Sequence, residues 1–181
     1  MKAILSLFFA TLLNGATIAQ QPAAGPLAEP EFAGVVFRLA AGALIPLERQ
    51  NTSIHTKASG FGVVHAKSVW EIAGAKSSIR FSSGSPLEFV VRTISAQVDP
   101  AQMYHIHKVD TKKKTREMLI ATARATIFGS VSTNQIAEGE IPVAFTRYGE
   151  ASVKITATGL APGEYAIQAA PFQAIFCFGV D

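Results

Sequence analysis

Hydrophobic and polar residues alternate along much of this chain, and the alternation is clearest near the C-terminus. Between positions 151 and 158, apolar side chains at 153, 155 and 157 are separated by Lys and Thr. This period of two predicts a strand with one buried face and one face in water. The segment 172–180 is almost wholly apolar, which predicts a strand that is covered on both faces.

Short segments of the same kind recur from position 35 onward, with turns rich in Gly, Ser and Pro between them. We expect 69–72 to pair with 78–81, and 104–109 to pair with 116–121, because a short polar turn joins the members of each pair. The full set of strands predicted before the C-terminal unit is 35–39, 43–47, 61–65, 68–72, 78–81, 87–93, 104–109, 116–121, 125–128 and 141–148.

The segments between these strands are mostly polar. Segment 48–53, which contains the glycosylation-type sequence Asn51-Thr52-Ser53, predicts a surface loop, and 130–139 predicts another. Segment 99–102 predicts one helical turn. Pro46 predicts an edge strand or a bulge, because proline has no N–H to donate to a neighbouring strand. About ten short strands without a long helix predict an all-β domain, either a sandwich or a barrel.

The segment Leu160-Ala161-Pro162-Gly163-Glu164-Tyr165-Ala166-Ile167 interrupts the alternation between two predicted strands. Pro162 fixes its own φ and Gly163 tolerates a positive φ, so the chain can turn sharply here. The segment resembles the tyrosine corner of immunoglobulin-like and fibronectin-type sandwiches, in which a Tyr hydroxyl bonds backbone a few residues upstream. The resemblance implies an immunoglobulin-like antiparallel β-sandwich, with Tyr165 at the corner and Leu160 closing the core. A β-barrel is the alternative.

The N-terminal residues have the pattern of an export signal. A lysine precedes an apolar run at 3–13, and Thr17-Ile18-Ala19 fits a cleavage site of small residues. We therefore predict a signal peptide at 1–19, a mobile Pro/Ala-rich linker at 20–30 and the folded β-sandwich domain at 31–181. The apolar run is shorter than the roughly 18 residues of a membrane-spanning helix, so no transmembrane span is expected in the mature chain.

Composition limits the classes of function. The 181 residues give room for one ordinary domain, and a hydrophobic content of 49% excludes disorder for most of the chain. The net charge of +3, without a long basic tract, argues against nucleic acid as a partner. The single cysteine excludes an internal disulfide framework. The ending Phe176–Asp181 is similar to the endings of exported bacterial proteins of unassigned activity, which together with the signal predicts a periplasmic or extracellular location.

His105 and His107 are the clearest candidates for chemistry. Residues i and i+2 of a strand project from one face, which is how β proteins often present imidazoles to Zn or Cu. The favoured interpretation places Tyr104 and Ile106 on the core face and both histidines on the exposed face, without a metal. A metal site would need a third and usually a fourth ligand. The candidates for these positions are His55, His65, Cys177, Asp99 and Asp110.

Three further features have a structural and a functional interpretation. Cys177 lies in an apolar strand with no cation beside it in the sequence, so we expect a buried structural thiol rather than a nucleophile. Trp70 is expected in the core with its ring edge near the surface, and stacking on carbohydrate is the alternative. The Lys112-Lys113-Lys114 run is expected to form a solvated turn, and contact with an anionic envelope or polysaccharide is the alternative.

No assembled catalytic motif accompanies these residues. The sequence has no Gly-x-Ser-x-Gly elbow, and its one Gly-x-Gly pair lacks the strand-to-helix setting of a phosphate-binding loop. The favoured hypothesis is therefore an exported, non-enzymatic β-sandwich module with a binding, accessory or structural role in the bacterial cell envelope. Its expected partner is an envelope protein or polysaccharide, and no cofactor is expected. The alternative is a periplasmic metal-binding protein or metalloenzyme that uses His105 and His107 to hold Zn or Cu.

Overall fold

The computed structural model describes residues 27–61, 63–126, 128–134, 139–170 and 174–181. In these ranges the chain forms strands in two sheets and one short 3-10 turn, η1 (Pro100–Gln102), where a helical turn is predicted. The all-β prediction is confirmed. No helix within the described ranges has the length and apolar character needed to cross a membrane. The predicted signal peptide and positions 20–26 of the predicted linker lie outside the described residues.

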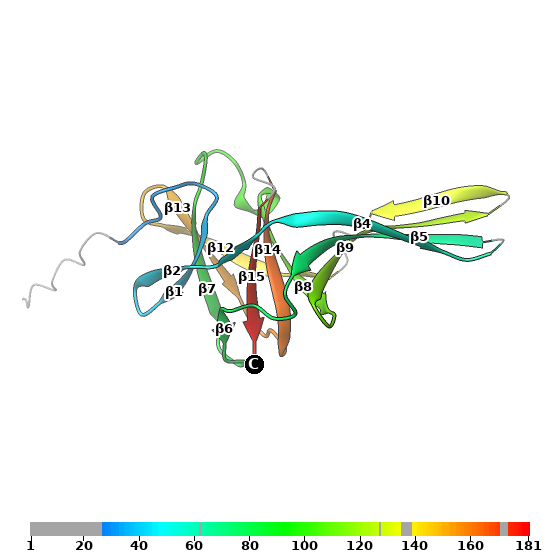
Figure 1. The fold of residues 1–181 in the computed structure, drawn as a ribbon. Helices are drawn as coiled ribbons and strands as arrows, with labels where there is room; N and C mark the ends of the chain where they lie inside the picture. The colour runs from blue at the N-terminus through cyan, green and yellow to red at the C-terminus, as the bar shows by residue number, and fades with distance from the viewer. Residues whose placement is uncertain (1–26, 62, 127, 135–138, 171–173) are drawn as a thin grey trace, which may run out of the picture.

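The strands fall into a smaller and a larger sheet (Figure 1). In chain order they are β1 (Val36–Ala40), β2 (Ala43–Pro46), β3 (Glu48–Gln50), β4 (Thr52–Ser59), β5 (Val63–Ala73), β6 (Arg80–Phe81), β7 (Leu87–Arg92), β8 (Tyr104–Thr111), β9 (Thr115–Thr126), β10 (Gly129–Asn134), β11 (Glu140–Ile141), β12 (Val143–Tyr148), β13 (Ser152–Ala157), β14 (Gly163–Ala169) and β15 (Ala174–Val180). The smaller sheet has the order β12-β13-β7-β1-β2, and the larger has the order β3-β15-β14-β8-β9-β5-β4. Strands β10, β11 and β6 join the larger sheet beside β9, β8 and β15. Neighbouring strands run antiparallel, except that β6 runs parallel to β15.

The two sheets share one hydrophobic core. Phe89 of the smaller sheet meets Phe81 and Phe178 of the larger, with ring centroids 5.6 and 5.0 Å away. Tyr165 stacks on Phe178 at 5.4 Å. All four rings are buried, so the packing of these aromatic side chains fixes the two sheets against each other. Strand β15 is buried along its whole length, as the apolar run at 172–180 predicts for its described part.

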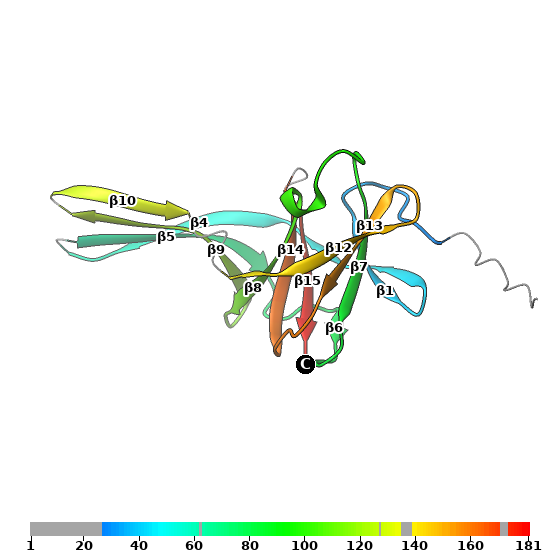
Figure 2. The same ribbon diagram turned by 180° about the vertical axis from the view of Figure 1, so that it is seen from behind.

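The larger sheet curls back toward its own first strand. Strands β3 and β4 stand at opposite ends of the strand order, although only Asn51 separates them in the chain. A second hydrophobic cluster therefore forms on the inner face of the curl, where Ile72 and Met118 pack with Ile175 and Cys177. The result is a half-barrel attached to the two-sheet body (Figure 2). It shares features with both predicted architectures.

The predicted corner has the expected hydrogen bond. The hydroxyl of Tyr165 donates to the carbonyl oxygen of Ala161 at 2.7 Å, and the ring is 1% exposed. Gly163 has φ 154°, a conformation that favours glycine. Leu160 is buried in the core between the sheets. The corner therefore ties the loop before β14 to the core residues that β14 carries.

One prediction about the number of strands and one about their pairing are wrong. The chain forms a single strand, β5, where two short strands are predicted at 61–65 and 68–72. It also does not form a hairpin between 69–72 and 78–81, because β5 pairs with β4 and β9, whereas β6 runs beside β15. These pairings join segments that are far apart in the sequence, so a local turn signal does not reveal them.

Both predicted polar loops contain strands. Segment 48–53 contributes β3 and the start of β4, and 130–139 contributes most of β10. Ser and Thr are suited to β4 and to positions 129–132 of β10 because the residues there are exposed or half-buried. Pro46 ends β2, which is an edge strand as predicted, and the chain then crosses to the other sheet through the buried Leu47.

Glu29, just before the predicted start of the domain, holds the first part of the described chain to the body. Its carboxylate accepts hydrogen bonds from the backbone N–H groups of Glu150 and Ala151, at 2.7 and 3.0 Å. It also accepts one from the Ser152 hydroxyl at 2.6 Å. Gly149 has φ +63°, and a Cβ at this position would lie 2.3 Å from the Glu29 carboxylate. Glycine at 149 is therefore required for this contact.

A four-stranded ribbon projects to one side of the body (Figures 1 and 2). Its described residues are 54–61, 63–68, 119–126 and 128–134, and we call it the arm. Its strand order is β4-β5-β9-β10. The two inner strands, β5 and β9, continue from the arm into the curled sheet, so the body holds the base of the arm in place.

Candidate functional site

His105 and His107 project from one face of β8, as predicted, with ring centroids 6.3 Å apart. Nδ1 of His105 lies 2.7 Å from Oε1 of Glu140, which β11 brings alongside β8. The prediction that Tyr104 and Ile106 face the core is confirmed. The prediction that both histidines are exposed is wrong for His107, which is 2% exposed.

Polar atoms at and near His107 lack hydrogen-bond partners among the described residues. Its Nε2 has no hydrogen-bond partner among the described residues, and neither has Oε1 of Gln168, which lies directly opposite His105 on β14. Burial lowers the pKa of His107 and outweighs the opposite effect of Glu140, so the ring is neutral at pH 7. Glu140 and Gln168 come from strands distant in sequence, and no sequence pattern connects them with the histidines.

The described residues bring no further donor to form a metal centre. Cys177 shares a register row with His107 but lies two strands away, about 10 Å at the usual strand spacing. Among the residues that the structure describes, no three His, Cys, Asp or Glu side chains are placed to share a metal ion. The other candidates are His55 on β4, His65 on β5, Asp99 at the start of η1 and Asp110 beside Lys67.

Purified exported protein is therefore expected to carry no stoichiometric Zn or Cu after dialysis against a weak chelator. Two imidazoles, one of them hydrogen-bonded to Glu140, provide too few ligands for a structural site. Elemental analysis of the wild type and of a His105→Ala/His107→Ala variant measures this. A stoichiometric metal that is present in the wild type and lost in the variant would instead support the alternative function.

Cys177 and Trp70 occupy structural positions. Cys177 is fully buried, and burial raises the pKa of its thiol to about 12, so the thiolate needed for nucleophilic attack does not form at neutral pH. The burial predicted for this thiol is confirmed. Trp70 is half-buried and packs against the second hydrophobic cluster, as expected for a core residue with one edge near the surface.

A cluster of buried charges lies on the inner face of the curl. The guanidinium of Arg116 is 0% exposed and donates to Glu48 at 2.8 Å and to the carbonyl oxygens of Ala73 and Gly74 at 2.9 and 3.0 Å. Burial raises the pKa of Glu48, but hydrogen bonds from Ser77 and Arg116 outweigh it and lower the pKa to about 2. A general acid needs a raised pKa, and the lowered pKa of Glu48 is the opposite of that.

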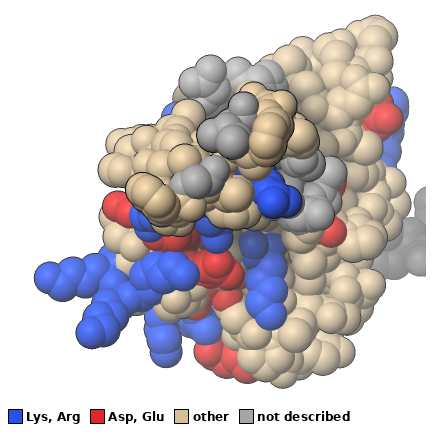
Figure 3. Space-filling view, turned by 90° about the vertical axis from the view of Figure 1, so that its right-hand side faces the viewer, with Lys and Arg blue, Asp and Glu red and all other residues tan. Residues whose placement is uncertain are grey.

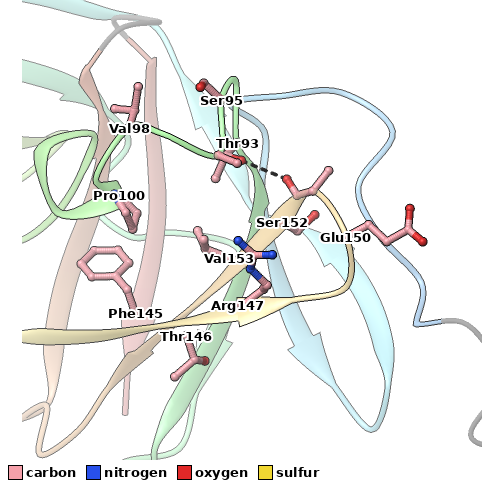
Figure 4. Close-up of a pocket in the computed structure, with 12 residues that line it drawn as sticks. Thr93, Ser95, Val98, Pro100, Phe145, Thr146, Arg147, Glu150, Ser152 and Val153 are labelled. Atoms are coloured by element: carbon pink, nitrogen blue, oxygen red, sulfur yellow. Dashed lines mark hydrogen bonds between the residues drawn. The ribbon is translucent and has the colours of Figure 1, made fainter.

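A pocket of about 220 Å³ opens between the β7–η1 connection and strands β12 and β13 (Figure 4). Two of its hydroxyl groups already serve the fold, since Thr93 donates to the carbonyl oxygen of Ala151 and Ser152 donates to Glu29. Its volume is below the roughly 300–1,000 Å³ of most small-molecule sites. The pocket is therefore a weak candidate for ligand binding.

The described residues of the arm form no hydrophobic core of their own. Directly paired residues of antiparallel strands share a face, so the register defines the two faces of the arm. A neutral row is formed by Ala58, Ala66, Ala123 and Ser132, and a polar row on the other face by Ser59, His65, Arg124 and Val131. The residues of both rows are exposed or half-buried, which leaves the arm as a single layer in water.

The free end of the arm presents two aromatic rings. Val63 pairs with Thr126 at the end of the β5–β9 ladder, so the β4–β5 and β9–β10 turns lie side by side. Phe61 in the first turn is 103% exposed and Phe128 in the second is 93% exposed. Gly60 has φ +120°, and a Cβ there would lie 2.0 Å from the Val63 carbonyl oxygen, so the tight first turn requires glycine.

One face of the arm is basic. Lys57 pairs directly with Lys67, an arrangement that is unfavourable for like charges, and His65 pairs directly with Arg124. At the base of the arm, the Lys57 ammonium lies 2.5 Å from the Glu117 carboxylate and the Lys67 ammonium lies 3.9 Å from that of Asp110. Arg124 has no acidic partner within the described ranges. Positions 52–70 and 118–134 contain no Asp or Glu.

The basic character continues onto the body beside the arm. Lys112 and Lys67 lie at 3.9 Å from the same Asp110 carboxylate, so the Lys112-Lys113-Lys114 turn adjoins the basic face of the arm. All three lysines of this turn are exposed, as predicted. In the view onto this end of the molecule, Lys and Arg side chains gather on one side (Figure 3).

Comparison of the chain with models of protein families, with curated proteins and with solved structures gives no match.

Proposed function

We propose that this protein is an exported, non-enzymatic β-sandwich module that binds a component of the bacterial cell envelope through its arm. The observation that carries the proposal is the arm itself, a single layer of strands ending in the exposed rings of Phe61 and Phe128. Elements of stable domains pack in at least two layers. A projecting layer with exposed aromatic side chains is typical of an interaction site.

The other parts of the proposal rest on sequence and on the corner. The export-signal pattern at 1–19 and the ending Phe176–Asp181 support a periplasmic or extracellular location in a bacterium. The hydrogen bond from Tyr165 to Ala161 supports an immunoglobulin-like arrangement of the two-sheet body. The charged residues near the body core are paired in structural contacts, which favours binding over catalysis.

A metal-binding function remains the second candidate. The buried Nε2 of His107 without a partner, close to His105 and Glu140, is the observation in its favour. The elemental analysis described above distinguishes the two candidates.

Purified exported protein is expected to bind a sedimented envelope preparation, and a Phe61→Ser/Phe128→Ser variant is expected to bind at least about tenfold more weakly. The exposed rings are the most apolar groups at the end of the arm, and buried aromatic side chains dominate binding energies. Phe32→Ser is the matched control, because Phe32 is an exposed aromatic residue, 66% accessible, outside the arm. Equal binding by the wild type and the double variant, or no binding by the wild type, would contradict the proposal.

A further inference from the structure

We propose that the arm binds the surface of an anionic lipid bilayer, with Phe61 and Phe128 inserted at the interface and the basic face of the arm over the headgroups. This inference rests on the proposed function and names the partner of the same site. Two independent features of the arm carry it. One is the pair of exposed rings at its free end, and the other is the sign and position of its charges.

The two rings form one apolar tip. Phe61 lies two residues before Val63, and Phe128 lies two residues after Thr126, while Val63 and Thr126 are paired at the end of the ladder. The two side chains therefore extend from the same end of a ribbon held by the body. Each ring is in contact with water over essentially its whole surface. A partner into which the end of the arm inserts would bury the most apolar surface of such a tip. The boundary between the headgroups and the acyl chains of a bilayer is a partner of this kind.

The charges are spaced for such a partner. Lys57 and Arg124 each precede a tip phenylalanine by four residues, or about 13 Å at about 3.3 Å per strand residue. Amphipathic segments enter the interface by about 5–10 Å. When the rings are inserted, Arg124 therefore lies at the level of the lipid phosphates, where a long basic side chain binds anionic headgroups. The Lys57 ammonium stays 2.5 Å from Glu117 at the base of the arm.

The absence of acids fits an anionic surface better than a mixed protein surface. No carboxylate occurs at positions 52–70 or 118–134, so nothing in these segments would repel lipid phosphates. Arg124, for which no described carboxylate compensates, gains a counter-ion when an anion covers the basic face of the arm. A second copy of the chain would place one basic face against another or leave the basic face uncovered.

The test is sedimentation of the exported protein with vesicles of phosphatidylcholine alone or mixed with phosphatidylglycerol, at low and at raised salt. The wild type is expected to bind the anionic vesicles and to dissociate as salt increases. Phe61→Ser/Phe128→Ser is expected to weaken this binding at least about tenfold. Removing the charges of Lys67 and Arg124 in a Lys67→Gln/Arg124→Gln variant is expected to weaken it about fivefold per charge.

Phe32→Ser is again the control and is expected to bind as the wild type does. Circular dichroism of every variant confirms that it is folded, which is expected because the tip side chains make no core contact. Equal binding to neutral and anionic vesicles, or equal binding by the wild type and the tip variant, would overturn the inference. Retained binding to the envelope preparation without vesicle binding would overturn it and leave the proposed function standing. Self-association that the tip variant abolishes, in the absence of vesicle binding, would identify a second copy as the partner and also overturn it.

Discussion

Replacing Arg116 with methionine is expected to lower the free energy of unfolding by about 3–5 kcal/mol. The guanidinium is fully buried and bonds Glu48 and two backbone carbonyl oxygens, while its Nη1 lies 3.6 Å from Glu164. Methionine fills much of the space but leaves two partly or fully buried carboxylates without this cation. An uncompensated buried charge is far more costly than the loss of the ion pair itself.

The controls for this prediction are substitutions in the same larger sheet. Arg49 is exposed on β3 next to Glu48 in the sequence, and Arg49→Met is expected to change stability by no more than about 0.5 kcal/mol. Arg116→Lys keeps the charge but loses the planar fork that contacts several acceptors, so an intermediate loss is expected. Denaturant unfolding of the wild type and the three variants measures these differences. An Arg116→Met protein as stable as Arg49→Met would contradict the structural role of the cluster.

The effect of Arg116→Met is expected to depend on pH. Burial raises the pKa of Glu48, but hydrogen bonds from Ser77, Arg116 and Ser78 outweigh it and lower the pKa from 4.5 to about 2. A lowered folded-state pKa stabilises the fold above pH 4.5, and this contribution is lost as pH falls toward 2. The difference in unfolding free energy between the wild type and Arg116→Met should therefore narrow over this range. If this difference in unfolding free energy does not change with pH, the ion pair with Glu48 is not the source of the Arg116 contribution to stability.

The segments predicted best from sequence are those whose neighbours in the chain are also their neighbours in space. β12 pairs with β13 and β14 pairs with β15, and these strands have a strong apolar pattern and a clear turn signal. The Tyr165 hydrogen bond is predictable for the same reason, because donor and acceptor are four residues apart. In these segments local turn chemistry and burial indicate the same structure.

The arm and the half-barrel could not be predicted in this way. A single-layer ribbon buries neither face, so β4 and β10 have little alternation of apolar and polar residues. Positions 52–53 of β4 and 130–134 of β10 are therefore predicted as polar loops. The proximity of Glu140 and Gln168 to the histidines depends on pairings of β8 with β11 and β14. Phe61 and Phe128 both stand beside glycine in the sequence, and glycine is a signal for a turn. Recognising them as one tip requires the β5–β9 register.

The tyrosine corner leads to the second large prediction. Tyr165→Phe is expected to cost about 1–3 kcal/mol, because it keeps the ring in the core and leaves the Ala161 carbonyl oxygen without its partner. Leu160→Ala is expected to cost about 2–5 kcal/mol through the cavity left at the end of the core. Thr158 is exposed in the same loop, so Thr158→Ala should stay within about 0.5 kcal/mol.

Denaturant unfolding of the exported protein and the three variants separates a corner from a tyrosine that merely packs. If only the ring matters, Tyr165→Phe is as stable as the wild type while Leu160→Ala is still destabilised. A corner requires that both variants lose stability, because the hydroxyl holds the loop that places Leu160 over the core. The bond at Tyr165 is also the main support for an immunoglobulin-like body. A Tyr165→Phe protein of unchanged stability would therefore favour the barrel, toward which the curl of the larger sheet already points.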